Sequence, residues 1–121
     1  IKETQKRTNV GLIATHNGKI VGACHIRTGR FREAHVGEFG IAIKKEFRGI
    51  GLGSFLMREI IQLAKTELKP KPKIIKLGVF ANNKPAIALY KKMGFKQVAV
   101  LPRHLEYKGN LVAEIIMYLE V

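Results

Sequence analysis

The pattern of apolar and polar positions begins with a run of alternating segments. Residues 9–27 predict two strands joined by a turn at Asn17-Gly18, a dipeptide that tolerates positive φ in tight hairpins. Residues 34–47 predict a third strand. Within it, Gly37 and Gly40 indicate a bulge or a close backbone approach.

Helical periodicity then replaces alternation. Apolar residues recur at helical spacing over residues 51–68, and a Lys-Pro-Lys-Pro run ends that helix. Residues 73–80 form a short apolar run, typical of a strand covered on both faces. Asn82 or Asn83 is expected to cap a second helix, which ends at Gly94.

Two more strands are predicted at residues 95–101 and 111–119, on either side of a polar turn. The element order is therefore β-β-β-α-β-α-β-β. Strand, helix and strand over residues 36–80 require a crossover, whereas the remaining strands favour antiparallel pairing. We expect a mixed α/β sheet and a single domain over residues 1–121.

Composition narrows the class of protein. The 121 residues are 46% hydrophobic and 26% charged, with a net charge of +13 that would attract a polyanion. No apolar run approaches the ~20 residues that span a bilayer, so we expect no membrane partner. Cys24 is the only cysteine, which fits a reducing compartment and a cytoplasmic location.

The stretch "FRGIGLGSF" carries the first candidate chemistry. Gly49, Gly51 and Gly53 stand behind Arg48 and directly ahead of the first helix. The first turn of a helix leaves about four amides without partners, and glycines leave those amides open to an anion. The arrangement suits a pyrophosphate.

Two other phosphate motifs do not fit this stretch. A P-loop requires Lys-Ser/Thr after its last glycine, but Phe55 and Leu56 follow here. A dinucleotide fingerprint requires glycine or alanine at Ser54 and an acidic residue near Lys73.

Two segments together resemble the GNAT superfamily of acetyl-CoA-dependent N-acetyltransferases. "FRGIGLGSFLM" is similar to its Arg/Gln-x-x-Gly-x-Gly/Ala motif, and "VFANNKPAIALYKKMGFK" to its Asn-x-x-Ala-x-x-x-Tyr-x-x-x-Gly-Phe signature. The matching positions are Arg48, Gly51, Gly53, Asn83, Ala86, Tyr90, Gly94 and Phe95. The last hairpin is similar to the alanine- and phosphinothricin-acetyltransferase-like branch, which often carries Asp where this chain has Ala113.

The resemblance covers roughly residues 9–120 and implies the GNAT fold. That fold begins with another strand and one or two helices, which line the acceptor pocket in relatives and are missing or shortened here. The chain also begins with Ile rather than Met. Either this chain lacks its front end or another chain supplies those elements.

The resemblance also implies a binding site for acetyl-CoA. The diphosphate would lie on the amides of residues 48–54, and the pantetheine arm would pair with the strand "FGIAI", where Gly40 would let it approach. The implied cofactor-binding residues are Ile41, Ala42, Ile43, Arg48, Gly49, Ile50, Gly51, Leu52, Gly53, Ser54, Asn83, Ala86 and Tyr90.

Two residues are the candidates for proton transfer. Tyr90, with an ordinary pKa near 10, would protonate the leaving thiolate, although an aromatic residue filling the core would give the same pattern. Glu38, between two glycines, would accept the amine proton if a bulge turned it toward the reaction centre. His35 and His104 are lesser alternatives.

Other polar residues receive more limited roles. Asn83 serves as a helix cap, with or without a contact to the cofactor. Cys24 is expected to be buried in a strand and to play no nucleophilic part. No metal-ligand spacing is present.

We therefore predict an enzyme that transfers acetyl from acetyl-CoA to a primary amine, carried by a small molecule or a peptide, by direct attack in a ternary complex. A non-catalytic acyl-CoA-binding module and, third, a basic nucleic-acid- or ribosome-associated domain are the alternatives. Few aromatic residues for base stacking disfavour nucleic acid. Homo-oligomers are compatible with the sequence.

Overall fold

The computed structural model describes residues 2–6 and 8–121 and has a mixed α/β fold, as predicted. Two compact units are present, one of residues 1–75 with Val121 and one of residues 76–120. In chain order the elements are β1 (Lys2–Lys6), β2 (Asn9–His16), β3 (Lys19–Thr28), η1 (Phe31–Glu33), β4 (Val36–Ile43), η2 (Lys45–Phe47), α1 (Leu52–Glu67), β5 (Ile74–Phe80), α2 (Lys84–Lys92), β6 (Lys96–Tyr107) and β7 (Asn110–Glu120).

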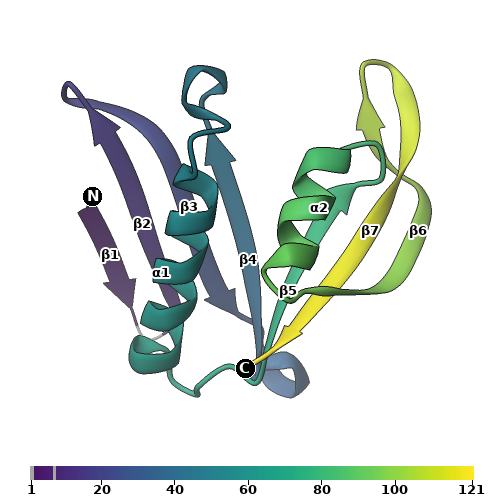
Figure 1. Cartoon of the computed structure of the whole chain (residues 1–121). Coiled ribbons are helices and arrows are strands. Elements are labelled where there is room, and N and C mark those ends of the chain that lie inside the picture. Colours follow the sequence, from purple (N-terminus) through teal and green to yellow (C-terminus); the bar gives the residue numbers. More distant parts are fainter. Residues whose placement is uncertain (1, 7) are drawn as a thin grey trace. The chain divides into compact units, whose positions relative to one another are not determined.

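The first unit is built on antiparallel strands in the order β1-β2-β3-β4 (Figure 1). Asn17 and Gly18 both have positive φ, 52° and 77°, which confirms the tight turn between β2 and β3. A register shift between Ala14 and Thr15 marks a bulge in this pair. The sequence pattern did not predict β1, because "KETQK" has no apolar residue to give it a period.

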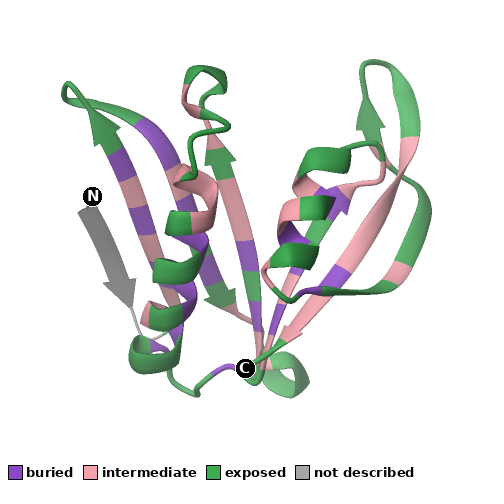
Figure 2. Ribbon diagram, viewed as in Figure 1, coloured by how far each residue is buried: buried purple, intermediate pink, exposed green. Residues whose placement is uncertain are grey.

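Helix α1 packs on one face of β2 and β3, and the core of the first unit lies between them (Figure 2). One stripe of α1 and alternate residues of the strands are buried, as the two periodicities require, except that Val21 and Gly22 are both buried where the β2–β3 register shifts. Each large aliphatic side chain that is fully buried contributes about 1.5–3 kcal/mol. The buried members are Val10, Leu12, Ala14, Val21, Cys24, Ile26, Phe39, Leu56, Met57, Ile60, Ile61 and Ala64.

In the second unit, β7 lies between β5 and β6 and pairs with β6 in antiparallel register. β5 was expected to be covered on both faces. Instead its residues alternate: Ile75, Leu77 and Val79 are buried, whereas Lys76 is half-buried and Gly78 is exposed. The apolar run therefore reflects one buried face, with Gly78 on the other face of the strand.

Candidate functional site

The loop before α1 has a backbone that only glycine adopts without strain. Gly49 and Gly51 have φ of 77° and 84°, in the left-handed region. Apart from the residues directly before and after it in the chain, no described residue has an atom within 4 Å of the position that a Cβ would take at either glycine. Gly51 is also the N-cap of α1. The loop therefore presents bare backbone to open space.

The amides that follow Gly51 are the chemically useful part of this loop. The N–H of Phe55 donates to the carbonyl of Gly51 at 3.1 Å, which is the first hydrogen bond of the helix. The N–H groups of Leu52, Gly53 and Ser54 come before it and have no acceptor within the helix. The first turn contains no acidic residue. The partial positive charge of the helix terminus is thus available to an anion.

Arg48 enters the site through its side chain rather than its amide. The N–H of Arg48 donates to the carbonyl of Lys45 at 3.2 Å, and Nε donates to the carbonyl of Ile43 at 3.0 Å. The Arg48 amide, expected to lie against the diphosphate together with the amides of residues 49–54, is therefore already hydrogen-bonded within the chain. Its guanidinium is held at the end of β4, beside the glycine loop.

Packing fixes the start of α1 against the sheet. A Cβ at Gly22 on β3 would lie 3.4 Å from Leu52 Cδ2 and 3.4 Å from Leu56 Cδ1, so these leucines rest directly on the strand. The N–H of Lys44 donates to the carbonyl of Val21 at 2.9 Å and ties the end of β4 to β3. The glycine loop therefore connects two elements, the end of β4 and the start of α1, that are both fixed against β3.

The ladder between β3 and β4 does not contain the bulge expected near Glu38. Its pairing with β3 runs without a shift from Gly22 opposite Ile43 to Thr28 opposite Gly37, over all described residues of that ladder. Glu38 is exposed and lies opposite Arg27. Its role as proton acceptor stays a prediction, and its pairing with β3 shows no bulge that would orient it.

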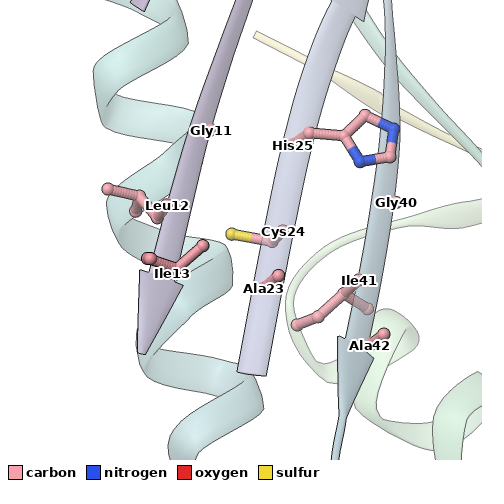
Figure 3. A pocket seen from close by; sticks show the side chains of 9 residues that line it. All are labelled: Gly11, Leu12, Ile13, Ala23, Cys24, His25, Gly40, Ile41 and Ala42. Atoms are coloured by element: carbon pink, nitrogen blue, oxygen red, sulfur yellow. The ribbon is translucent and has the colours of Figure 1, made fainter. Parts of the chain in front are cut away.

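The glycines of β4 instead make room for neighbouring side chains. A Cβ at Gly37 would lie 2.7 Å from Ile26 Cγ2, and a Cβ at Gly40 would collide with the imidazole of His25. Figure 3 shows the His25 ring extending from β3 over Gly40. The predicted close approach is real, but the group that approaches Gly40 on this face is a histidine of the same chain.

A shallow pocket of about 290 Å³ lies on β2, β3 and β4. The pocket includes two of the three β4 residues, Ile41 and Ala42, that the family resemblance assigns to the pantetheine arm. Its lining residues are Gly11, Leu12, Ile13, Ala23, Cys24, His25, Gly40, Ile41 and Ala42 (Figure 3).

The second unit holds the other signature segment. Oδ1 of Asn83 accepts a hydrogen bond from the N–H of Ala86 at 3.3 Å, so Asn83 rather than Asn82 caps α2. At the other end, Gly94 (φ 103°) donates to Lys91 at 3.0 Å and Phe95 donates to Tyr90 at 2.9 Å, a Schellman motif. The helix is thus fixed at both ends.

Tyr90 is buried on α2, with 8% of its surface exposed, and its ring centroid lies 6.1 Å from that of Phe95. Burial raises the pKa of Tyr90 above its ordinary value of 10.0. The phenol therefore stays protonated through the neutral range. Of the predicted site residues, Glu38, Ile41–Ile43 and Arg48–Ser54 belong to the first unit, and Asn83, Ala86 and Tyr90 to the second.

The burial predicted for Cys24 is confirmed: it is 4% exposed, and its thiol donates to the carbonyl of Leu56 at 3.8 Å. Burial raises its pKa from 9.0 to about 11. Between these values the unfolded chain ionises while the folded chain does not, so alkaline pH weakens the folded state in that window.

At pH 8, iodoacetamide should alkylate the native thiol of Cys24 at least roughly a hundredfold more slowly than the urea-unfolded thiol, measured by mass spectrometry. Equal rates would contradict the buried placement.

Sequence reasoning did not connect His104 with Glu114. Nδ1 of His104 lies 2.6 Å from Oε1 of Glu114, across β6 and β7. The available signal was Gly78, because a glycine inside an apolar strand indicates the close approach of another group.

Within the described part of the chain, no group of three His, Cys, Asp or Glu residues could hold a metal ion. No helix among the described residues is long and apolar enough to cross a membrane.

The sequence of this chain matches the model of a known protein family. The family model described as "Acetyltransferase (GNAT) family" matches residues 2–95. That range contains the glycine loop of α1, the Asn83 cap and Tyr90. The chain belongs to the acetyltransferase (GNAT) family, which confirms the resemblance drawn from the two motifs.

Individual relatives agree with this assignment. L-amino acid N-acetyltransferase AaaT of Escherichia coli (strain K12) is 40% identical over 86 residues, which cover 70% of this chain and 52% of AaaT. The crystal structure of a GNAT-family acetyltransferase from Streptococcus pneumoniae has a TM-score of 0.86 at 30% identity, covering 96% of this chain and 69% of that one. The structure of yncA from Salmonella typhimurium, solved with its cofactor acetyl-CoA, shares the fold with a TM-score of 0.81 at 21% identity, covering 93% of this chain and 67% of that one. The chain spans about half the length of the curated relatives it matches.

Proposed function

We propose that the protein is an N-acetyltransferase that moves an acetyl group from acetyl-CoA to a primary amine by direct attack in a ternary complex. Family membership supports the reaction class. The single observation that supports acetyl-CoA as the cofactor is the geometry of the N-terminus of α1. There, the first-turn amides of Leu52, Gly53 and Ser54 follow left-handed Gly51, with no acidic residue in that turn.

The residues present fit the diphosphate of acetyl-CoA. Gly49 and Gly51 leave the space over the backbone open, and the Arg48 side chain is anchored at its edge. A pyrophosphate bound there would receive amide donors and the helix dipole together. Bound acetyl-CoA supplies the thioester whose carbonyl carbon the amine attacks. The backbone of Ile41–Ile43 on β4 is the proposed partner of the pantetheine arm, and one of its amides would polarise the thioester carbonyl.

Proton transfer falls to side chains. The attacking amine must lose a proton before attack, and the departing thiolate must gain one. Tyr90, kept protonated by burial, is the proposed donor to the thiolate. Glu38 is the proton acceptor that the sequence suggests.

The acceptor is proposed from chemistry and relatives together. The name of AaaT assigns L-amino acids to that relative. We therefore expect a small primary amine, with L-amino acids tested before peptide N-termini. A cytoplasmic location, inferred from the lone Cys24, stays a prediction.

Two measurements on the full chain test the proposed function. Titration calorimetry should detect acetyl-CoA binding, and pantetheine, which lacks the diphosphate together with the 3′-phosphorylated adenosine, should bind at least roughly a hundredfold more weakly. A thiol-release assay with an amine panel should then show amine-dependent turnover. Tight binding without thiol release for any amine would identify an acyl-CoA-binding module instead. Equal affinity for pantetheine and acetyl-CoA would remove the α1 terminus from the site.

A further inference from the structure

His104 and Glu114 form a close pair on the second unit. The distance from Nδ1 of His104 to Oε1 of Glu114 is 2.6 Å, short even for a charge-assisted hydrogen bond. An irregularity of β6 creates the pair: the register shifts between Leu101 and Leu105, and Arg103 has φ of 56°. Such irregularities redirect single side chains and are common beside active sites. Here the shift brings His104 to a carboxylate on β7.

The Glu114 carboxylate has a built seat. A Cβ at residue 78 would collide with Oε2 of Glu114, so the carboxylate lies directly over the bare backbone of Gly78 on β5. The Glu114 side chain is only 17% exposed, whereas the His104 side chain is 57% exposed. The Glu114 carboxylate is therefore fixed by its surroundings, whereas the His104 imidazole is accessible to solvent.

The hydrogen bond to the Glu114 carboxylate determines which ring nitrogen of His104 carries the proton. An ionised carboxylate accepts hydrogen bonds and cannot donate them, so Nδ1 must be the donor to Glu114. In neutral His104, Nε2 then has a lone pair. A carboxylate that orients an imidazole and stabilises its protonated form is the arrangement that makes histidine an effective proton acceptor.

The pair lies beside the second GNAT signature segment. The N–H of Ala81, directly after β5, donates to the carbonyl of Ala113 at 2.9 Å. Ala113 precedes Glu114, and Ala81 lies two residues before the Asn83 cap of α2. The strand that seats Glu114 therefore leads within a few residues into the helix that carries Tyr90. Glu38, by contrast, is an exposed strand residue opposite Arg27.

We propose that His104 accepts the proton of the acceptor ammonium, with Glu114 as its positioning residue. This inference rests on the proposed function and deepens it. The ammonium N–H bond breaks, and its proton passes to Nε2 of His104. The freed nitrogen lone pair forms the bond to the acetyl carbon, and the carbon–sulfur bond breaks. The acetylated nitrogen then loses its second proton to solvent. The thiolate takes a proton from Tyr90, whose phenol regains one from solvent, and His104 returns its own to solvent.

The test compares variants in amine-dependent thiol release, with acetyl-CoA affinity measured in parallel. His104→Ala should lower kcat roughly a hundredfold, the lower range for a general base, without changing acetyl-CoA affinity. Added imidazole should restore part of the rate, which a purely structural role would not allow. Glu114→Gln should lower kcat less. In long-range ¹H–¹⁵N spectra, it should also remove the preference of His104 for the Nδ1–H tautomer. His16→Gln, at an exposed histidine on β2, is the matched control and should retain the wild-type rate.

The outcomes separate this inference from the function on which it rests. Wild-type turnover with full activity in His104→Ala overturns the inference and leaves the acetyltransferase standing. Loss of turnover in Glu38→Gln with full activity in His104→Ala assigns the proton to Glu38 and also overturns it. Wild-type protein that binds acetyl-CoA but acetylates no amine removes the proposed function, and the inference falls with it.

Discussion

Replacing Gly51 with glutamate should abolish acetyl-CoA binding while leaving the protein folded. No described atom lies within 4 Å of a Cβ at this position, so the new side chain has room and disturbs little packing. It places a carboxylate beside the amides that we assign to the diphosphate. Two like charges about 4 Å apart near a protein surface repel by roughly 4 kcal/mol, close to a thousandfold in affinity. Titration calorimetry gives the affinity, and circular dichroism checks the fold.

Two matched variants isolate the charge from the backbone strain. Gly51→Ala adds the same left-handed strain, about 1–2 kcal/mol, without a charge, and should retain acetyl-CoA affinity within about tenfold. Gly109→Glu introduces the same residue at nearly the same φ, 82° against 84°, in the open turn between β6 and β7. It should bind acetyl-CoA as the wild type does. Unchanged affinity in Gly51→Glu would place the diphosphate elsewhere.

Features that depend on local chemistry followed from the sequence. The turn at Asn17-Gly18, the start of α1 after Gly51 and the Asn83 cap each need only a few neighbouring residues. Turn and cap preferences act within such short segments. The two GNAT motifs lie on the start of α1 and on the Asn83 cap, so the resemblance to the family is present in short segments of the sequence.

Features that depend on contacts between distant residues did not follow. Gly37 and Gly40 indicate a bulge or a close approach, but the sequence contains no sign that the group filling the space over Gly40 is the side chain of His25. The pairing of His104 with Glu114 requires the register shift in β6 and the bare backbone of Gly78 on another strand. Hydrophobic period specifies which face of a strand is buried, but it does not specify which side chain crosses to a neighbouring strand.

Replacing Tyr90 with phenylalanine should lower turnover much more than it lowers acetyl-CoA affinity. The substitution keeps the buried ring and its contact with Phe95, and removes only the hydroxyl that we propose as proton donor. Loss of a general acid costs roughly 10²–10⁴-fold in rate, so we expect kcat to fall at least about a hundredfold. Thiol release at saturating amine gives kcat, and calorimetry gives the affinity for acetyl-CoA.

The pH dependence and a second tyrosine complete this test. Because burial raises the pKa of Tyr90 above 10.0, the wild-type phenol stays protonated from pH 7 to pH 9, and its ionisation should not lower the rate in that range. Tyr118→Phe removes a hydroxyl from a half-buried tyrosine on β7 and should retain wild-type turnover. If Tyr90→Phe also retains it, Tyr90 packs the core and the thiolate takes its proton from another donor. Similar losses in both variants, accompanied by a lower unfolding midpoint, would instead indicate that a missing hydroxyl weakens the fold. A selective loss in Tyr90→Phe, with the midpoint unchanged, is the result that assigns the proton to this phenol.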